Sequence, residues 1–395
     1  MIALSEPEDR RAAAEDRFDP LVLDTEVDAH ELYREMRAAC PVAHSDRFGG
    51  FWAIFGYQDV QRVLTDSRTF ITSVQNIVPR IAFTGRRPPL HLDPPEHTVY
   101  RRVLNPLISD ERVASVEPTI RRYAKECLVP LLSRGGGDYG EEFAANYPIL
   151  AFARFLNVDD QMMYRIRDEF EVFNKAVKDD DADLMVRASL ALYEITKELI
   201  ADRQAHPKDP TIDPASALLA AQVDGEPLPI DMVIGTVRQV LLVGIVAPRF
   251  VLGSMVARLA GDPDLQDQLR RHPDLIGAAI EELLRLDSPY RGFARTANRD
   301  VTIGDRLICK DEPIAMVFEA PDEFRFDRAE RHIAFGLGPH QCPGAAWARM
   351  ELRVALEELL SRTTSFSLDG PLDMTRWPEF GATSVPLRIV AREGE

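Results

Sequence analysis

The chain has 395 residues, 45% of them hydrophobic, and a formal net charge of −17 at pH 7. This suits a globular protein with one large core, and the negative charge disfavours nucleic acid or an anionic membrane as a general partner. The first twenty residues lack the basic start and apolar run of a secretory signal, and no stretch reaches the ~20 apolar residues of a membrane span. We therefore expect a cytoplasmic monomer, with residues 1–20 as a flexible lead-in and residues 21–395 as one domain.

Helical patterns dominate the chain. DPPEHTVYRRVLNPLI predicts a helix with Asp93 as its N-cap and Pro94 at its first position. Apolar periodicity predicts further helices over 112–132, 181–202, 228–260, 272–286 and 344–362. Strand patterns are few, and they cover 50–55, 300–304 and 384–391. The sequence shows no internal repeat or linker, so it predicts a mainly α, single-domain fold with a small β-rich part.

The four cysteines are scattered and form no C-x-x-C pair, which argues against a disulfide framework and against a cysteine-rich zinc site. Cys342 stands in AFGLGPHQCPGAAWARMEL, where glycines and a proline indicate a tight turn and a helix runs from about Gly344. A helix N-terminus lowers the pKa of a thiol, and the thiolate then acts as a nucleophile or as a metal ligand. A lone buried cysteine with no chemical role is the alternative.

The cysteine loop matches the pattern FGxGxHxCxG at every fixed position: Phe335, Gly336, Gly338, His340, Cys342 and Gly344. It resembles the haem-binding loop of the cytochrome P450 family, and the resemblance covers nearly the whole chain. It implies a P450 haem domain over residues 21–395, which binds haem b with Cys342 as the axial thiolate ligand of the iron. Phe335, Gly336, His340 and Gly344 are then cofactor-binding residues.

The same resemblance implies two further groups of charged residues. The motif E-x-x-R is present as Glu282 and Arg285, which share one helix face; an isolated pair of this kind is usually exposed and worth little. In the family a second arginine, here Arg328, joins the pair in a structural network behind the cysteine loop. Haem also carries two propionates, and the positions that match their partners in the family are His97, Arg101, Arg295 and His340.

The long apolar helix departs from the family pattern A-G-x-[DE]-T, which lies over the distal side of the iron. Here Val246 replaces the acid and Ala247 replaces the alcohol, and neither side chain relays a proton. Pro248 is expected to widen or kink the helix. Arg249 is a candidate for holding a substrate carboxylate, and the alternative is an ion pair with an acidic neighbour. A second departure is a shortened segment before Pro321.

The resemblance also places a substrate pocket, which is apolar with an aromatic wall and suits a mid-sized hydrophobic molecule. Beside Val246 and Ala247 its expected lining is Ile77, Ile81, Phe83, Val243, Tyr290 and Phe293. Some of these side chains are alternatively plain core residues.

The expected function is oxidation of an apolar small molecule, such as a secondary metabolite, with electrons from a ferredoxin and its reductase. Arg102, Arg349 and Arg353 would form a basic patch for the ferredoxin, or they are arginines of an ordinary solvated face. The altered distal helix keeps two alternatives open. One is a peroxide-driven or non-redox haem-thiolate enzyme of the isomerase or dehydratase type, and the other is a non-catalytic haem-binding sensor.

Overall fold

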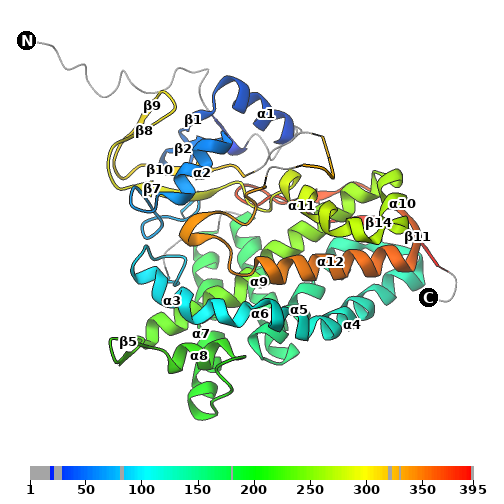
Figure 1. The fold of residues 1–395 in the computed structure, drawn as a ribbon, viewed down its shortest axis with the longest axis horizontal. Coiled ribbons are helices and arrows are strands. Elements are labelled where there is room, and N and C mark those ends of the chain that lie inside the picture. Colours follow the sequence, from blue (N-terminus) through cyan, green and yellow to red (C-terminus); the bar gives the residue numbers. More distant parts are fainter. Residues whose placement is uncertain are drawn as a thin grey trace, which may run out of the picture.

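The computed structural model describes residues 18–21, 29–80, 84–178, 181–318, 323–328 and 331–392. A β-rich part containing the N-terminal strands, drawn at the upper left of Figure 1, packs against a larger helical part that fills the lower half and the right-hand side of the picture. The helices are α1 (Ala29–Ala39), α2 (Tyr57–Thr65), α3 (Glu96–Leu104), α4 (Asp110–Arg134), α5 (Tyr147–Leu156), α6 (Asp160–Lys178), α7 (Ala182–Ala205), α8 (Pro214–Ala220), α9 (Ile230–Ala260), α10 (Pro263–Arg271), α11 (Ile276–Leu286) and α12 (Ala345–Arg362). The predicted mainly α fold is confirmed.

The strands form one five-stranded sheet and several smaller ones. They are β1 (Val42–Ser45), β2 (Phe51–Ile54), β3 (Phe70–Ile71), β4 (Gly136–Asp138), β5 (Gln222–Val223), β6 (Glu226–Pro227), β7 (Phe293–Ala297), β8 (Val301–Ile303), β9 (Arg306–Ile308), β10 (Pro313–Met316), β11 (Thr363–Leu368), β12 (Asp373–Met374), β13 (Ala382–Ser384) and β14 (Pro386–Ala391). The large sheet has the order β1-β2-β10-β7-β3, in which β2 and β10 are parallel and the other pairs antiparallel. A three-stranded sheet has the order β11-β14-β4.

Helix α9 forms the centre of the helical part and packs against α5, α7 and α12. Among the described residues it is the one helix long and apolar enough to cross a membrane, but 67% of its apolar window is buried inside the protein. A helix that is apolar on all sides and surrounded by others is a core helix. At Gly244 a β-carbon would overlap the ring of Phe152 in α5, so glycine is required for this close packing. The helix continues through Pro248 as a single α-helix.

Polar caps explain where several helices begin. Ser109 accepts a hydrogen bond from the N–H of Arg112 at the start of α4, as is usual for an N-cap serine. The predicted start of α3 was wrong, because the helix begins at Glu96. The carboxylate of Asp93 does not cap it and instead accepts hydrogen bonds from the N–H groups of Thr72 (2.8 Å) and Ser73 (3.2 Å).

The β-rich part has its own apolar clusters. One of them includes Phe18, which is 3% exposed and contacts the rings of Phe55 and Trp377 at centroid distances of 5.2 and 5.7 Å. Phe18 belongs to the predicted lead-in, so part of that segment packs on the domain. Arg295 of strand β7 pairs with Ile314 of β10 in the large sheet, and both residues are buried.

Candidate functional site

The turn before Cys342 depends on glycine. Gly336 and Gly338 have φ values of 66° and 69°, which other residues adopt with strain. Gly338 also packs tightly, because a β-carbon there would lie 2.5 Å from the carbonyl oxygen of Leu64. The N–H of Cys342 donates to the carbonyl of Phe335 (2.8 Å), which closes the turn.

Cys342 lies two residues before the N-cap of α12, which is Gly344, as the sequence predicted. Its side chain is exposed on one side, while protein surrounds the rest closely enough that burial raises the pKa of the thiol. The Gly344 N–H and the charges of Arg101 and Arg349 lower that pKa by less than burial raises it. The N–H at the helix start does lower the pKa of the thiol, as predicted, but burial raises it by more. The prediction of a net lowered pKa was therefore wrong. A thiol of this kind loses its proton when a metal ion binds the sulfur.

Four basic side chains from three parts of the chain gather near this turn. His97 and Arg101 come from α3, Arg295 from β7, and His340 from the 3₁₀ turn Gly338–His340. The rings of His97 and His340 lie 4.3 Å apart, and the Nε2 of His340 lies 3.2 Å from the Thr72 hydroxyl. Arg101 donates to the carbonyl of Gln341 (2.7 Å), which links α3 to the cysteine loop. The structure thus brings together the four predicted propionate partners.

Burial and mutual repulsion keep the two imidazoles of this cluster neutral. The pKa of His97 is lowered to about 4 by burial and then by Arg101, and that of His340 to about 2 by burial and then by Arg295. Burial also lowers the pKa of Arg295 to about 10. The site is therefore rich in N–H donors and positive charge.

This cluster fits the two carboxylates of a haem. Both ring nitrogens of His97 are buried and have no hydrogen-bond partner in the described structure. Buried donors beside cations are costly unless an anion satisfies them, and propionates are such anions. The Cys342 thiol nearby supplies the soft sulfur ligand that a haem iron takes. The residues present therefore fit the group that the resemblance implies.

Glu282, Arg285 and Arg328 form a buried ion network. Glu282 binds Arg285 through both carboxylate oxygens at 2.9 Å, and it accepts from Nε of Arg328 at 3.0 Å. The backbone N–H of Arg325 donates to the same carboxylate (3.1 Å). The carboxylate and both guanidinium groups are mostly buried, so each charge depends on the others for compensation.

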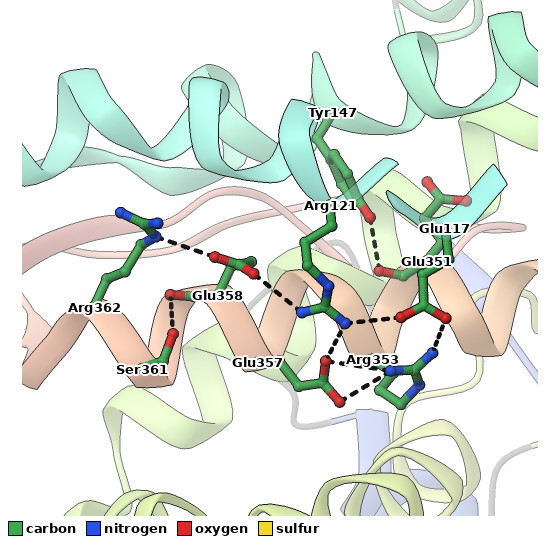
Figure 2. Close-up of polar contacts among 9 residues, drawn as sticks. All are labelled: Glu117, Arg121, Tyr147, Glu351, Arg353, Glu357, Glu358, Ser361 and Arg362. Atoms are coloured by element: carbon green, nitrogen blue, oxygen red, sulfur yellow. Dashed lines mark hydrogen bonds and ion pairs between the residues drawn. The ribbon is translucent and has the colours of Figure 1, made fainter. Parts of the chain in front are cut away.

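The three arginines of the expected ferredoxin patch differ in their surroundings. Arg349 binds Glu281 through two nitrogens (2.6 and 2.8 Å). Arg353 belongs to a network between α4 and α12 and binds Glu117 and Glu357 (Figure 2). Both charges are thus compensated by carboxylates, whereas Arg102 on α3 is exposed. The positive potential of this surface is weaker than the sequence suggested.

The distal helix carries the predicted apolar residues, and its arginine is engaged elsewhere. Val246 is buried, and Val243 is 48% exposed although it lies in the core helix α9. Arg249 forms ion pairs with Glu171 and with Glu141 (3.2 Å). This is the alternative that the sequence left open, and it makes Arg249 unsuitable for holding a substrate carboxylate.

Three of the expected pocket residues lie together. Ile77 forms an isolated β-bridge with Phe293, and the rings of Tyr290 and Phe293 are 4.4 Å apart. Val243 belongs to α9 and is not in this cluster of contacts. Ile81 and Phe83 lie outside the described residues, as does most of the shortened segment before Pro321.

Sequence reasoning missed several residues that hold the site. Thr72 binds both His340 and Asp93, and Glu281 binds Arg349 and His332. These contacts join residues far apart in the chain and have no local motif. Glu281 directly precedes Glu282 of the E-x-x-R motif. Its place in that helix was the one sequence feature that could have suggested a role near the site.

Comparison with known proteins agrees with this geometry. A family model described as Cytochrome P450 matches residues 148–390. Cytochrome P450 107B1 of Saccharopolyspora erythraea is 33% identical over 377 residues, with 89% of this chain and 91% of that protein covered. Linalool 8-monooxygenase of Pseudomonas putida is 30% identical over 373 residues, with 86% and 90% covered.

A solved structure supports the same assignment. Cytochrome P450 CYP109Q5 from Chondromyces apiculatus matches with a TM-score of 0.81 and 26% identity, over 96% of this chain and 100% of that chain. The chain therefore belongs to the cytochrome P450 family, and it is an oxidoreductase that carries haem b with a cysteine thiolate as axial ligand.

Proposed function

We propose that this chain is a monooxygenase that oxidises a mid-sized apolar molecule, such as a secondary metabolite, with Cys342 as the thiolate ligand. The observation that carries the proposal is the convergence of the Cys342 thiol with four basic side chains that need an anionic partner. When bound, the haem supplies the iron centre at which the substrate is oxidised. Family membership makes the chain an enzyme, so a non-catalytic sensor is not retained.

Three groups of residues have separate proposed roles in holding the haem, supporting the cysteine loop and binding the substrate. His97, Arg101, Arg295 and His340 would hold the haem edge by donating hydrogen bonds to its carboxylates. Both ring nitrogens of His97 have no other partner among the described residues. The network of Glu282, Arg285 and Arg328 supports the cysteine loop from behind. The apolar and aromatic side chains of Ile77, Tyr290 and Phe293 bind the substrate and exclude water from it.

A ferredoxin and its reductase are the proposed electron source, and the proposed location is the cytoplasm, with the protein acting as a monomer. The curated bacterial relatives motivate these assignments. Because Arg349 and Arg353 are paired with carboxylates, Arg102 is the member of the patch best able to contact an acidic partner.

The distal helix favours a second candidate, a peroxide-driven or non-redox enzyme on the same scaffold. From residue 240 to residue 248, α9 has no acid, alcohol or amide side chain. A relay that passes protons to the distal side then has no side-chain donor in this segment of the helix. Peroxide arrives already reduced and protonated, and a rearrangement needs no oxidant.

Product analysis under four conditions tests these functions. The monooxygenase predicts product with NAD(P)H, ferredoxin, its reductase and air, whereas the second candidate predicts product with hydrogen peroxide alone or under nitrogen with no oxidant. In Ala247→Thr, a large gain in product formed per NAD(P)H consumed would support the monooxygenase. Unchanged peroxide-driven or anaerobic turnover would support the second candidate, and no product under any condition would contradict both.

A further inference from the structure

Arg87 and Arg238 form a pair of cations for which the described structure has no carboxylate partner. Arg238, on α9, is 2% exposed, and its Nε and Nη1 have no hydrogen-bond partner. Nε of Arg87 is likewise buried and unsatisfied. Burial and the charge of Arg87 lower the pKa of Arg238 to about 9. An unpaired buried charge of this kind is destabilising, and two together more so.

The fold holds the two side chains in place through neighbouring residues. At Gly235, one turn before Arg238, a β-carbon would overlap the carbonyl oxygen of Arg86, so the loop containing Arg87 packs directly on α9. Nη2 of Arg238 donates to the Ser189 hydroxyl of α7 (3.0 Å), and its guanidinium lies 5.2 Å from the Tyr193 ring centre. These contacts position Arg238 without neutralising it.

Three other buried arginines of the chain have carboxylate partners. Arg203 binds Asp213 at 2.9 Å, and Arg285 binds Glu282 at 2.9 Å. Arg249, on the same helix as Arg238, binds Glu141 and Glu171. Arg87 and Arg238 differ from these three in having buried guanidinium nitrogens and no carboxylate partner among the described residues, which indicates a missing anion.

Arg87 lines a cavity of about 200 Å³ together with Arg80, Arg86 and His91. Arg238 is not part of this lining and lies close enough to Arg87 for the two charges to repel each other. None of the described residues that line the cavity is an aspartate or a glutamate. Burial, and then the positive charges of Arg87, Arg238 and Arg86, lower the pKa of His91 to about 3. Ile77 lines the same cavity and forms a β-bridge with Phe293, so the cavity and the proposed substrate pocket share this residue.

We propose that Arg87 and Arg238 bind a carboxylate of the substrate, so that the molecule oxidised is an organic acid with an apolar body. This inference rests on the proposed function and names the substrate class of that site. A guanidinium presents a planar fork of donors that matches a carboxylate, and two forks give a specific anchor. Arg238 and Val246 are eight residues apart on α9, about 12 Å along the helix axis. The acid group therefore anchors one end of the substrate and lies far from the distal position of Val246.

Spectral titration of the haem-loaded protein tests the anchor. The probes are hexanoate, octanoate, decanoate, dodecanoate and tetradecanoate, each compared with its methyl ester. At least one acid is expected to shift the Soret band with a Kd about tenfold or more below that of its ester. Arg238→Met and Arg87→Met should each remove most of that difference. Arg122→Met is the control, because this exposed arginine on α4 loses the same charge far from the cavity.

Thermal unfolding adds a readout that does not depend on the Soret band. Arg238→Met should unfold at a higher temperature than the native protein in buffer without organic acid, because an uncompensated buried charge is removed. The bound acid should raise the unfolding temperature of the native protein and not of the variant.

The anchor is wrong if every acid binds no tighter than its ester, or if both arginine variants keep the full preference. A variant less stable than the native protein, together with no stabilisation by any acid, would assign a structural role to Arg238. The reduced carbon monoxide spectrum is recorded for each protein. If that spectrum shows no haem-thiolate in the native protein, the proposed function fails; if it does and the acid preference is absent, only the anchor fails.

Discussion

The imidazole rings of His97 and His340 lie 4.3 Å apart and are inclined by 54°, one from α3 and the other from the cysteine loop. Burial is the main cause that lowers the pKa of each, to about 4 and about 2. Both rings are therefore neutral at pH 7, and each has an N–H to donate. This pairing connects the proposed propionate site directly to the turn that contains Cys342.

Replacing His97 should weaken haem binding. His97→Phe keeps a buried ring but removes the N–H donor, and a hydrogen bond to a charged acceptor contributes about 1.5–3 kcal/mol, so haem should leave roughly ten times faster or more. The measurement is the rate of haem transfer from the purified protein to excess apomyoglobin. His206→Phe is the control, because that side chain is 80% exposed. Equal rates for His97→Phe and the native protein would contradict the assignment.

Removing the carboxylate of Glu282 should strongly destabilise the fold. Glu282→Ala leaves Arg285 and Arg328 mostly buried without their shared partner, which costs about 3–5 kcal/mol. Chemical denaturation monitored by circular dichroism measures the change. Glu126→Ala removes a carboxylate that is 56% exposed and should change little. A Glu282→Ala variant as stable as this control would show that the network does not stabilise the fold.

The carboxyl of Glu379 should make stability depend on pH. Burial raises its pKa from 4.5 to about 7, and Arg291 offsets only part of that shift. Between these two values the folded protein binds more protons than the unfolded chain. The stability from this group is therefore fully present below pH 4.5 and is lost as the pH rises through 7.

Glu379→Gln removes this dependence. Allowing for its partial exposure, we expect the variant to gain roughly 2 kcal/mol over the native protein above pH 8 and little near pH 5. Thermal unfolding across that range measures the difference, with Glu126→Gln as the exposed control. A gain that is equal at both pH values would exclude titration of Glu379 as its cause.

The sequence predicted those parts of the fold that depend on local pattern. Long apolar periodicity located α4, α7, α9, α11 and α12, and short strand-like segments located β2, β8 and β14. The strands β3 and β7 were not predicted, because they are defined by pairing with each other across more than two hundred residues, which no local pattern shows. The start of α3 was misplaced because Asp93 looked like an N-cap, whereas its partners Thr72 and Ser73 lie in a distant segment.

In the candidate site, too, local motifs were predictable and contacts between distant segments were not. The fixed spacing of the cysteine loop was enough to place Cys342 and His340. The net pKa of the thiol was not predictable, because burial is a property of the assembled chain and outweighs the local N–H groups. Likewise, nothing in the sequence distinguishes Arg238, which has no carboxylate partner among the described residues, from Arg249, which has two.

The carbon monoxide difference spectrum of the reduced protein tests most directly whether Cys342 binds the haem iron. We predict the strongly red-shifted Soret band of a thiolate-ligated haem for the native protein, and its loss in Cys342→Ala with haem still supplied. Cys127→Ala is the control and should keep the band. A native protein without the red-shifted band, or a Cys342→Ala variant that retains it, would contradict the account.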